Sequence, residues 1–245
     1  QRNAPATIYI EGDGEDPLIG HNPTPTDPIV LRLAAQDGEP NVIWLARPCQ
    51  YNKGWKDGKS CPAEYSAAKR FAPEVIDTYN QVLDNIKAYY GVTDLNLVGY
   101  DGGAAIAAIL SSQRSDITSL RTVAGNLDPK TAAMAQESAY LDGSLTPMDF
   151  AAGTAAIPQR HFIGKADTIM PPVVYNSYAQ AVAQGKCLNV TLVDNADHSS
   201  GWVEQWKTLK NLPTDCSAPD TPQPVVFDPT PLDGDKYKIK PKAKK

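Results

Sequence analysis

The chain has 245 residues, of which 42% are hydrophobic and 21% are charged. This is ordinary usage for a globular protein, so the composition excludes intrinsic disorder for the body of the chain and suits one domain with a sizeable core. The net charge of −5 disfavours nucleic acid as a partner. The longest apolar run, Ala104 to Leu110, is far shorter than the roughly 20 residues that span a bilayer, so no transmembrane segment is expected.

Predicted strands and helices alternate along the chain. Apolar runs between turn signals predict strands over 7–10, 41–46, 95–98, 118–124, 160–164 and 189–194. Helical spacing of apolar residues and proline-led starts predict helices over 28–36, 73–90, 103–113, 173–183 and 202–209. This alternation is typical of an α/β fold with a mostly parallel central sheet and helices on both faces. Ligands of such sheets bind at the carboxyl ends of the strands.

Two stretches fall outside this alternation. Residues 126–158 are predicted to form a short insertion rather than a large cap. From Ser217 onward the chain has six prolines and, in its last ten residues, six lysines without an acid. We therefore predict a domain over 1–216 and a Pro- and Lys-rich tail over 217–245, whose lysines can touch an anionic surface.

Four cysteines indicate the compartment. Their even number and the lack of a C-x-x-C spacing favour two disulfides over a metal site, with buried free thiols as the alternative. Proximity in sequence pairs Cys49 with Cys61 and Cys187 with Cys216. Because the chain starts at Gln1 without a basic and apolar leader, we interpret it as a mature secreted or periplasmic chain without its signal segment.

The segment Gly99-Tyr100-Asp101-Gly102-Gly103 joins a predicted strand to a predicted helix. It has the form of the nucleophile elbow G-x-S-x-G, in which small neighbours let one side chain stand exposed above a sheet. Here that side chain is the carboxylate of Asp101. Tyr100 is predicted to pack rather than to take part in chemistry.

An acid and a histidine each follow a later strand. Asp167 comes just after strand 160–164, and His198 just after strand 189–194. The chain order is therefore nucleophile position, acid, histidine, which is that of the α/β-hydrolases. Capping of the following helix is the alternative role for Asp167.

Other polar residues near these positions have plainer interpretations. His161 lies in a predicted strand and is expected to be a core or surface residue, while His21 follows the Gly12-Asp13-Gly14 turn and can line the pocket. Asp194 and Asp197 are expected to be solvated loop acids. A divalent ion held by His21, Asp13, Asp101 and His198 is disfavoured because their spacing matches no metal signature.

On these motifs the chain resembles the secreted serine esterases and lipases of the α/β-hydrolase fold, over approximately Thr7 to Leu209. The resemblance implies that Asp167 orients His198, which faces position 101. It also implies an oxyanion hole made of the turn Gly12, Asp13 and Gly14 with the backbone N–H of Gly102. The implied substrate is a small-molecule or lipid-like acyl compound, with no cofactor.

Three interpretations of Asp101 remain. The favoured one is a serine hydrolase framework whose serine has been replaced, leaving a chain that is inactive or impaired on esters. The second is a true aspartate nucleophile as in haloalkane dehalogenases and epoxide hydrolases, but these usually place tryptophan where this chain has Gly102, and their larger caps supply donors where the insertion here offers only Tyr140. The third is a non-catalytic binding module that keeps the pocket.

Overall fold

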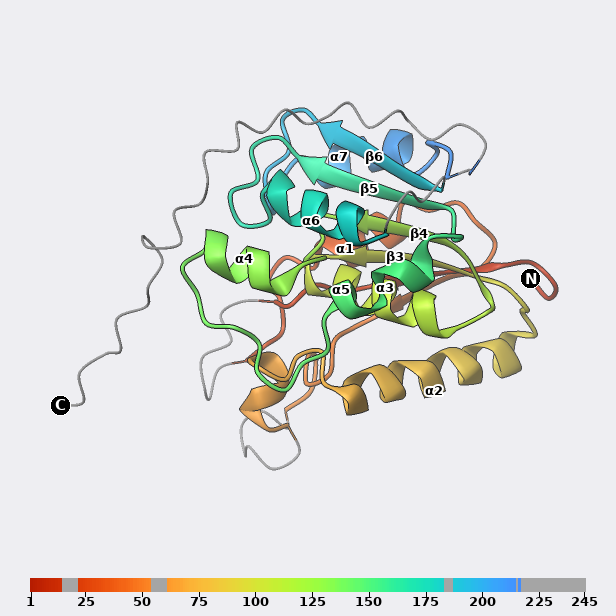
Figure 1. Cartoon of the computed structure of the whole chain (residues 1–245). Helices are drawn as coiled ribbons and strands as arrows, with labels where there is room; N and C mark the ends of the chain where they lie inside the picture. The colour runs from red at the N-terminus through yellow and green to blue at the C-terminus, as the bar shows by residue number, and fades with distance from the viewer. Residues whose placement is uncertain (15–21, 54–60, 183–186, 215, 217–245) are drawn as a thin grey trace.

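The computed structural model describes residues 1–14, 22–53, 61–182, 187–214 and 216. His21 and the predicted tail over 217–245 lie outside the described residues. Figure 1 shows the arrangement of the described elements.

Six parallel strands form the central sheet, in the order β2-β1-β3-β4-β5-β6. The strands are β1 (Ala6–Ile10), β2 (Val42–Leu45), β3 (Leu95–Tyr100), β4 (Ile117–Val123), β5 (Gln159–Gly164) and β6 (Leu188–Val193). Each matches a strand that the sequence predicts. The parallel α/β architecture is therefore confirmed, with all six carboxyl ends at one edge of the sheet.

Helices connect the strands. The α-helices are α1 (Ile29–Ala34), α2 (Pro73–Tyr90), α3 (Gly102–Gln113), α4 (Pro129–Ala135), α5 (Pro147–Phe150), α6 (Pro172–Val182) and α7 (Trp202–Leu209), and 3₁₀ turns are η2 (Ala63–Ser66) and η3 (Ala151–Thr154). Helix α2 has the expected signals at both ends, with Pro73 in its first turn and Gly91 in the left-handed conformation after its last residue. Helix α1 is shorter than the predicted 28–36, because the chain after Ala34 tightens into i→i−3 hydrogen bonds.

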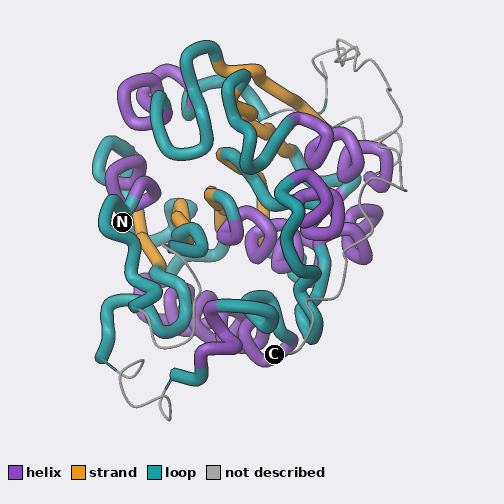
Figure 2. Tube along the Cα trace, turned by 90° about the vertical axis from the view of Figure 1, so that its left-hand side faces the viewer, coloured by secondary structure: helices purple, strands orange, loops and turns teal. Residues whose placement is uncertain are grey.

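The sheet is buried on both faces, and its side chains alternate between two apolar layers. Ile8, Ile10 and Leu97 pack with α2, α3 and α6, whereas Tyr9, Val98 and Tyr100 pack with α1 and α7. Figure 2 shows the strands in a row through the middle of the molecule, between helices on its two sides. Burial on both faces explains why the strands read as continuous apolar runs rather than as an alternating pattern.

The insertion over 126–158 contains α4, α5 and η3, which the sequence analysis did not resolve. Each α-helix starts with a proline after a side-chain cap: Asp128 accepts hydrogen bonds from two backbone N–H groups of α4, and Thr146 accepts one from α5. Helices of seven and four residues are too short to show an apolar period. The capping residues with their prolines were the only available signal.

Both disulfides join the cysteines that proximity in sequence suggests, Cys49 with Cys61 and Cys187 with Cys216. The first ties down the loop after β2, and the second joins the start of β6 to the chain beyond α7. Among the described residues, no helix combines the length and apolar character that a membrane span needs.

Candidate active site

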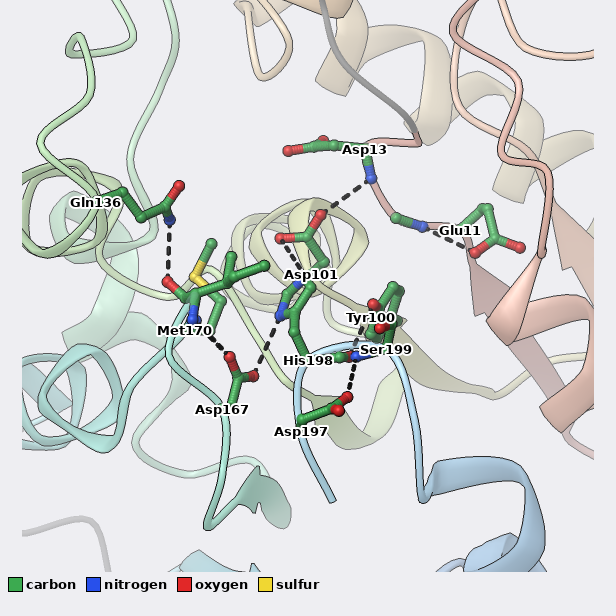
Figure 3. A network of polar contacts seen from close by, with 12 residues as sticks. Glu11, Asp13, Tyr100, Asp101, Gln136, Asp167, Met170, Asp197, His198 and Ser199 are labelled. Atoms are coloured by element: carbon green, nitrogen blue, oxygen red, sulfur yellow. Dashed lines mark hydrogen bonds and ion pairs between the residues drawn. The ribbon is translucent and has the colours of Figure 1, made fainter. Parts of the chain in front are cut away.

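Four loops meet at the carboxyl edge of the sheet, each following a different strand. Asp13 follows β1, Asp101 follows β3, Asp167 follows β5 and His198 follows β6. Figure 3 shows a chain of polar contacts that runs from Asp167 to His198, from His198 to Asp101, and from Asp101 to Asp13. The parallel sheet thus brings together residues that lie up to 185 positions apart in the chain.

Asp101 occupies a strained turn between β3 and α3. Its backbone angles are φ 50° and ψ −120°, a region that side-chain-bearing residues seldom adopt and that is concentrated at functional sites. The turn needs close neighbours without side chains. A Cβ on Gly99 would lie 2.4 Å from the carbonyl oxygen of Gly103, and one on Gly102 would lie 2.0 Å from Oδ1 of Asp13. The glycines of the motif therefore permit the turn and the approach of the loop after β1.

His198 is held by a buried acid on one side. Its Nδ1 lies 3.1 Å from Oδ2 of Asp167, whose side chain has no exposed surface. The other oxygen of Asp167 accepts hydrogen bonds from the backbone N–H groups of Ile169 and Met170, at 2.9 and 2.8 Å. These bonds fix the carboxylate, so the imidazole has one preferred orientation with Nε2 directed at Asp101 (Figure 3).

The backbone of His198 is fixed as well. The Tyr100 hydroxyl and the Trp202 indole N–H both donate to its carbonyl oxygen, at 2.9 and 3.0 Å. Tyr100 is buried and packs in the apolar layer, as expected, but it also positions the histidine loop. The sequence analysis missed this second role.

The Asp101 carboxylate lies between the histidine and two backbone donors. Its Oδ1 is 3.9 Å from Nε2 of His198, and its Oδ2 accepts a hydrogen bond of 3.1 Å from the N–H of Asp13. The backbone N–H of Gly102 also stabilises the charged carboxylate. Asp101 therefore accepts a hydrogen bond from the 12–14 turn, which the sequence suggests as one oxyanion donor, and the other suggested donor, the N–H of Gly102, favours its charged form.

The charges at this site act on one another. Burial lowers the pKa of His198, but the hydrogen bond to Asp167 and the negative charges of Asp101 and Asp167 outweigh it, so the pKa of His198 is raised. Burial, followed by repulsion from Asp13, raises the pKa of Asp101, while His198 and the two N–H groups oppose that shift. An ionised Asp101 thus favours a protonated His198.

Two arginines hold the side chain of Asp13. Arg47 pairs with its Oδ1 and Arg70 with its Oδ2, the latter at 2.6 Å. Arg47 also donates to the carbonyl oxygen of Arg70 at 2.7 Å, and its side chain is 4% exposed. The sequence analysis identified neither arginine. Arg47 follows β2 as directly as Asp13 follows β1, and this position was the available signal.

The other two residues of the 12–14 turn are used differently from Asp13. The N–H of Gly12 donates to Glu11, and its carbonyl oxygen accepts from Gln50. Gly14 borders the cavity in a left-handed conformation. The buried Glu11 also accepts from Trp44 and from the first turn of α1, so it anchors the whole turn. Within the described part of this turn, only the backbone N–H of Asp13 donates a hydrogen bond to Asp101.

A cavity of about 600 Å³ opens beside Asp101 and His198. Much of its wall is apolar, with Ala67, Ala132, Ala133, Leu141, Ile169 and Met170. Tyr140, from the insertion, also borders it and is half exposed. The cavity is large enough for a small organic ligand.

The remaining sequence candidates among the described residues make other contacts. His161 is buried in β5 and hydrogen-bonded to Thr122 and Gln159, so it is a core residue. Asp194 is exposed and pairs with Lys165, while Asp197 caps the backbone of Ser199 and Ser200. Among the described residues, no group of three or more histidine, cysteine or acidic side chains is arranged to hold a metal ion.

Comparison with solved structures identifies the fold. Est1E of Butyrivibrio proteoclasticus superposes with a TM-score of 0.59 at 14% identity, covering 86% of this chain and 87% of its own. The Pyrococcus furiosus esterase Pf2001 gives 0.58 at 12% identity, covering 85% and 81%. A Klebsiella pneumoniae protein assigned as a dienelactone hydrolase gives 0.56 at 16% identity, covering 81% and 77%. The chain has the α/β-hydrolase fold.

No protein-family model matches the sequence, and a search of curated proteins finds no significant match. At identities of 12–16% the similarity to α/β-hydrolases establishes the fold alone. The residues at the carboxyl edge of the sheet carry the information on function.

Proposed function

We propose that this chain is an α/β-hydrolase framework for hydrolysis of a small-molecule or lipid-like acyl ester, kept inactive or nearly so by Asp101 at the nucleophile position. In this framework His198 is the general base, Asp167 orients it, and the N–H groups of Asp13 and Gly102 form the oxyanion hole. The single observation that carries the proposal is the position of the Asp101 carboxylate, which contacts these N–H groups and faces His198.

Three physical effects make Asp101 a poor replacement for serine. Its carboxylate occupies the donors that would stabilise the oxyanion of a tetrahedral intermediate. Its negative charge also favours protonated His198, which cannot accept a proton as a base. Attack of a carboxylate on an ester would moreover give a mixed anhydride, which is less stable than the ester. Each effect disappears when serine stands at position 101.

The test compares the native chain with Asp101→Ser on p-nitrophenyl butyrate. We expect kcat/KM to rise by at least about 10³-fold, because loss of a triad nucleophile typically costs on the order of 10⁶-fold in kcat. Asp101→Ala is the matched control, since it removes the charge and frees the N–H groups without supplying a nucleophile. A folded Asp101→Ser protein that is no better than Asp101→Ala would overturn the proposal.

A further variant, His198→Ala, tests whether Asp101 is a true aspartate nucleophile. A carboxylate that attacks an alkyl carbon forms an alkyl ester, which His198→Ala should trap because no base remains to activate water. Intact-mass measurements after incubation with haloalkanes and epoxides would reveal that ester on Asp101. We expect no adduct. An adduct would assign the chain to the aspartate-nucleophile class instead.

We further propose that the protein works outside the cytoplasm as one domain over residues 1–216. The disulfides Cys49–Cys61 and Cys187–Cys216 support an oxidising compartment, and the second bond ties the chain beyond α7 to β6. Reduction should lower the free energy of unfolding by about 2–4 kcal/mol per disulfide. Urea unfolding with and without a reductant measures this, and identical curves would contradict a stabilising role.

A further inference from the structure

The guanidinium of Arg70 has an N–H donor at the cavity wall that the described residues leave unused. Its Nη1 donates to Asp13 at 2.6 Å and its Nε donates to the carbonyl oxygen of Ala67 at 2.8 Å. Its Nη2 makes no hydrogen bond to any residue in the described part of the chain, and its side chain is 18% exposed. The guanidinium therefore borders the same cavity as Asp101 and His198 with donors to spare.

The cluster around Arg70 carries an excess positive charge. One carboxylate, that of Asp13, is shared by the two guanidinium groups of Arg47 and Arg70. Asp101 is a second negative charge that acts on Arg70. Burial lowers the pKa of Arg70, but the charge of Asp13, the hydrogen bond to it and the charge of Asp101 outweigh burial, so that pKa is raised. If serine replaces Asp101, two guanidinium groups share the single carboxylate of Asp13, so one positive charge has no partner of its own. Because buried charges are normally paired, this charge favours a negatively charged ligand.

We propose that the cavity recognises an ester that carries a carboxylate on one of its two arms, and that Arg70 binds this carboxylate. The inference rests on the proposed function and names its substrate class. A guanidinium group offers parallel N–H donors that match a carboxylate, and hydrogen bonds between charged groups are roughly twice as strong as neutral ones. The apolar wall formed by Ala67, Ala132 and Ala133 suits the hydrocarbon part of such a molecule.

The test uses matched pairs of esters with Asp101→Ser as the parent protein. For the acyl arm, p-nitrophenyl hydrogen adipate is compared with p-nitrophenyl hexanoate; for the alcohol arm, 4-acetoxybenzoate is compared with phenyl acetate. The readout is the ratio of kcat/KM for the anionic ester to that for its neutral partner. Any loss that arises from a displaced Asp13 loop affects both esters and cancels in this ratio.

Arg70→Gln, which keeps an amide donor near Asp13 but removes the charge, should lower the ratio for one of the two pairs by about 10- to 100-fold, the equivalent of one charged hydrogen bond. Arg70→Lys should retain part of the ratio because it keeps the charge. Lys69→Gln is the matched control: Lys69 is exposed and paired with Glu64, so its removal changes the net charge equally and should leave the ratio unchanged.

Equal losses on anionic and neutral esters would overturn the proposal, because they would mean that Arg70 supports only the Asp13 loop or the oxyanion. If the parent protein hydrolyses neither class of ester, the proposed function fails. Carboxylate binding by Arg70 is then tested separately, by titration calorimetry of Asp101→Ser with hexanoate and with neutral hexanamide. Hexanoate binding that Arg70→Gln abolishes and Lys69→Gln retains would support the anion site. Absent binding, or binding that is independent of Arg70, would overturn it.

Discussion

The two described histidines differ in their protonation chemistry although both are largely buried. His161 lies within β5, where it is hydrogen-bonded to the Thr122 hydroxyl at 2.7 Å and the Gln159 side chain at 3.0 Å. Burial, followed by the positive charge of Arg160, lowers the pKa of His161 to about 3. His198 lies in the loop after β6 between two carboxylates, and its pKa is raised.

The contrast shows that the partners, rather than burial itself, decide the state of a histidine. Neutral partners cannot compensate an imidazolium, so His161 stays neutral and serves as a hydrogen-bonding element of the core. Carboxylates can compensate the charge of an imidazolium, so the pKa of His198 is raised, and Asp101 contributes to that rise. Three measurements test this difference between the two histidines.

The largest expected effect is a loss of kcat when Asp167, the acid that orients His198, is replaced. In the Asp101→Ser protein, Asp167→Asn should lower kcat on p-nitrophenyl butyrate by about 10⁴-fold, because an amide favours the wrong tautomer of the imidazole. His161→Gln in the same parent is the control and should leave kcat within about threefold. Esterase assays at pH 8 measure both. A similar loss in the two variants would remove the distinction between the histidines.

The second effect is a pH dependence of stability that arises from His161. The folded pKa of about 3 lies below the usual value of about 6.5 in an unfolded chain, so the stabilisation is complete above about pH 6.5 and is lost as the pH falls toward 3. The slope is about 1.4 kcal/mol per pH unit. From pH 6.5 to 5 the native chain should lose about 2 kcal/mol that His161→Gln does not lose.

Urea unfolding at these two pH values measures that difference. His198 does not obscure it, because a raised folded pKa gives a stabilisation that is complete below about pH 6.5 and is lost only as the pH rises through the folded pKa. Equal losses in the native chain and in His161→Gln would show that the core histidine is protonated in the folded state.

The smallest effect is a change in the titration of His198. Asp101→Asn removes one negative charge beside the imidazole, so the pKa of His198 should fall. Proton NMR of the histidine ring signals measures this, with signals assigned by single His→Gln variants. His161 should not titrate between pH 5 and 9 in either protein. An unchanged His198 titration would mean that Asp101 does not hold it charged.

Much of the fold and part of the site could be predicted from local sequence. The six strands and the long helices follow from apolar runs, prolines and glycines, because these signals set the conformation of the chain over only a few neighbouring residues. Asp101, Asp167 and His198 could be identified because each comes just after a strand, and parallel strands place such positions at one edge. The helices α4 and α5 are too short to show a period of apolar residues, so their capping residues are the local signal for them.

Local sequence patterns predict the elbow around Asp101, the order of acid and histidine, and the parallel sheet that brings them together. The surroundings of these residues depend on the folded chain. There Asp101 lies against the N–H groups of Asp13 and Gly102, Arg47 and Arg70 share Asp13, and Tyr100 donates a hydrogen bond to the backbone of His198. The physical reason is that a turn depends on neighbours in the chain, whereas charge and hydrogen bonding depend on distances in space, between residues that the sequence keeps far apart.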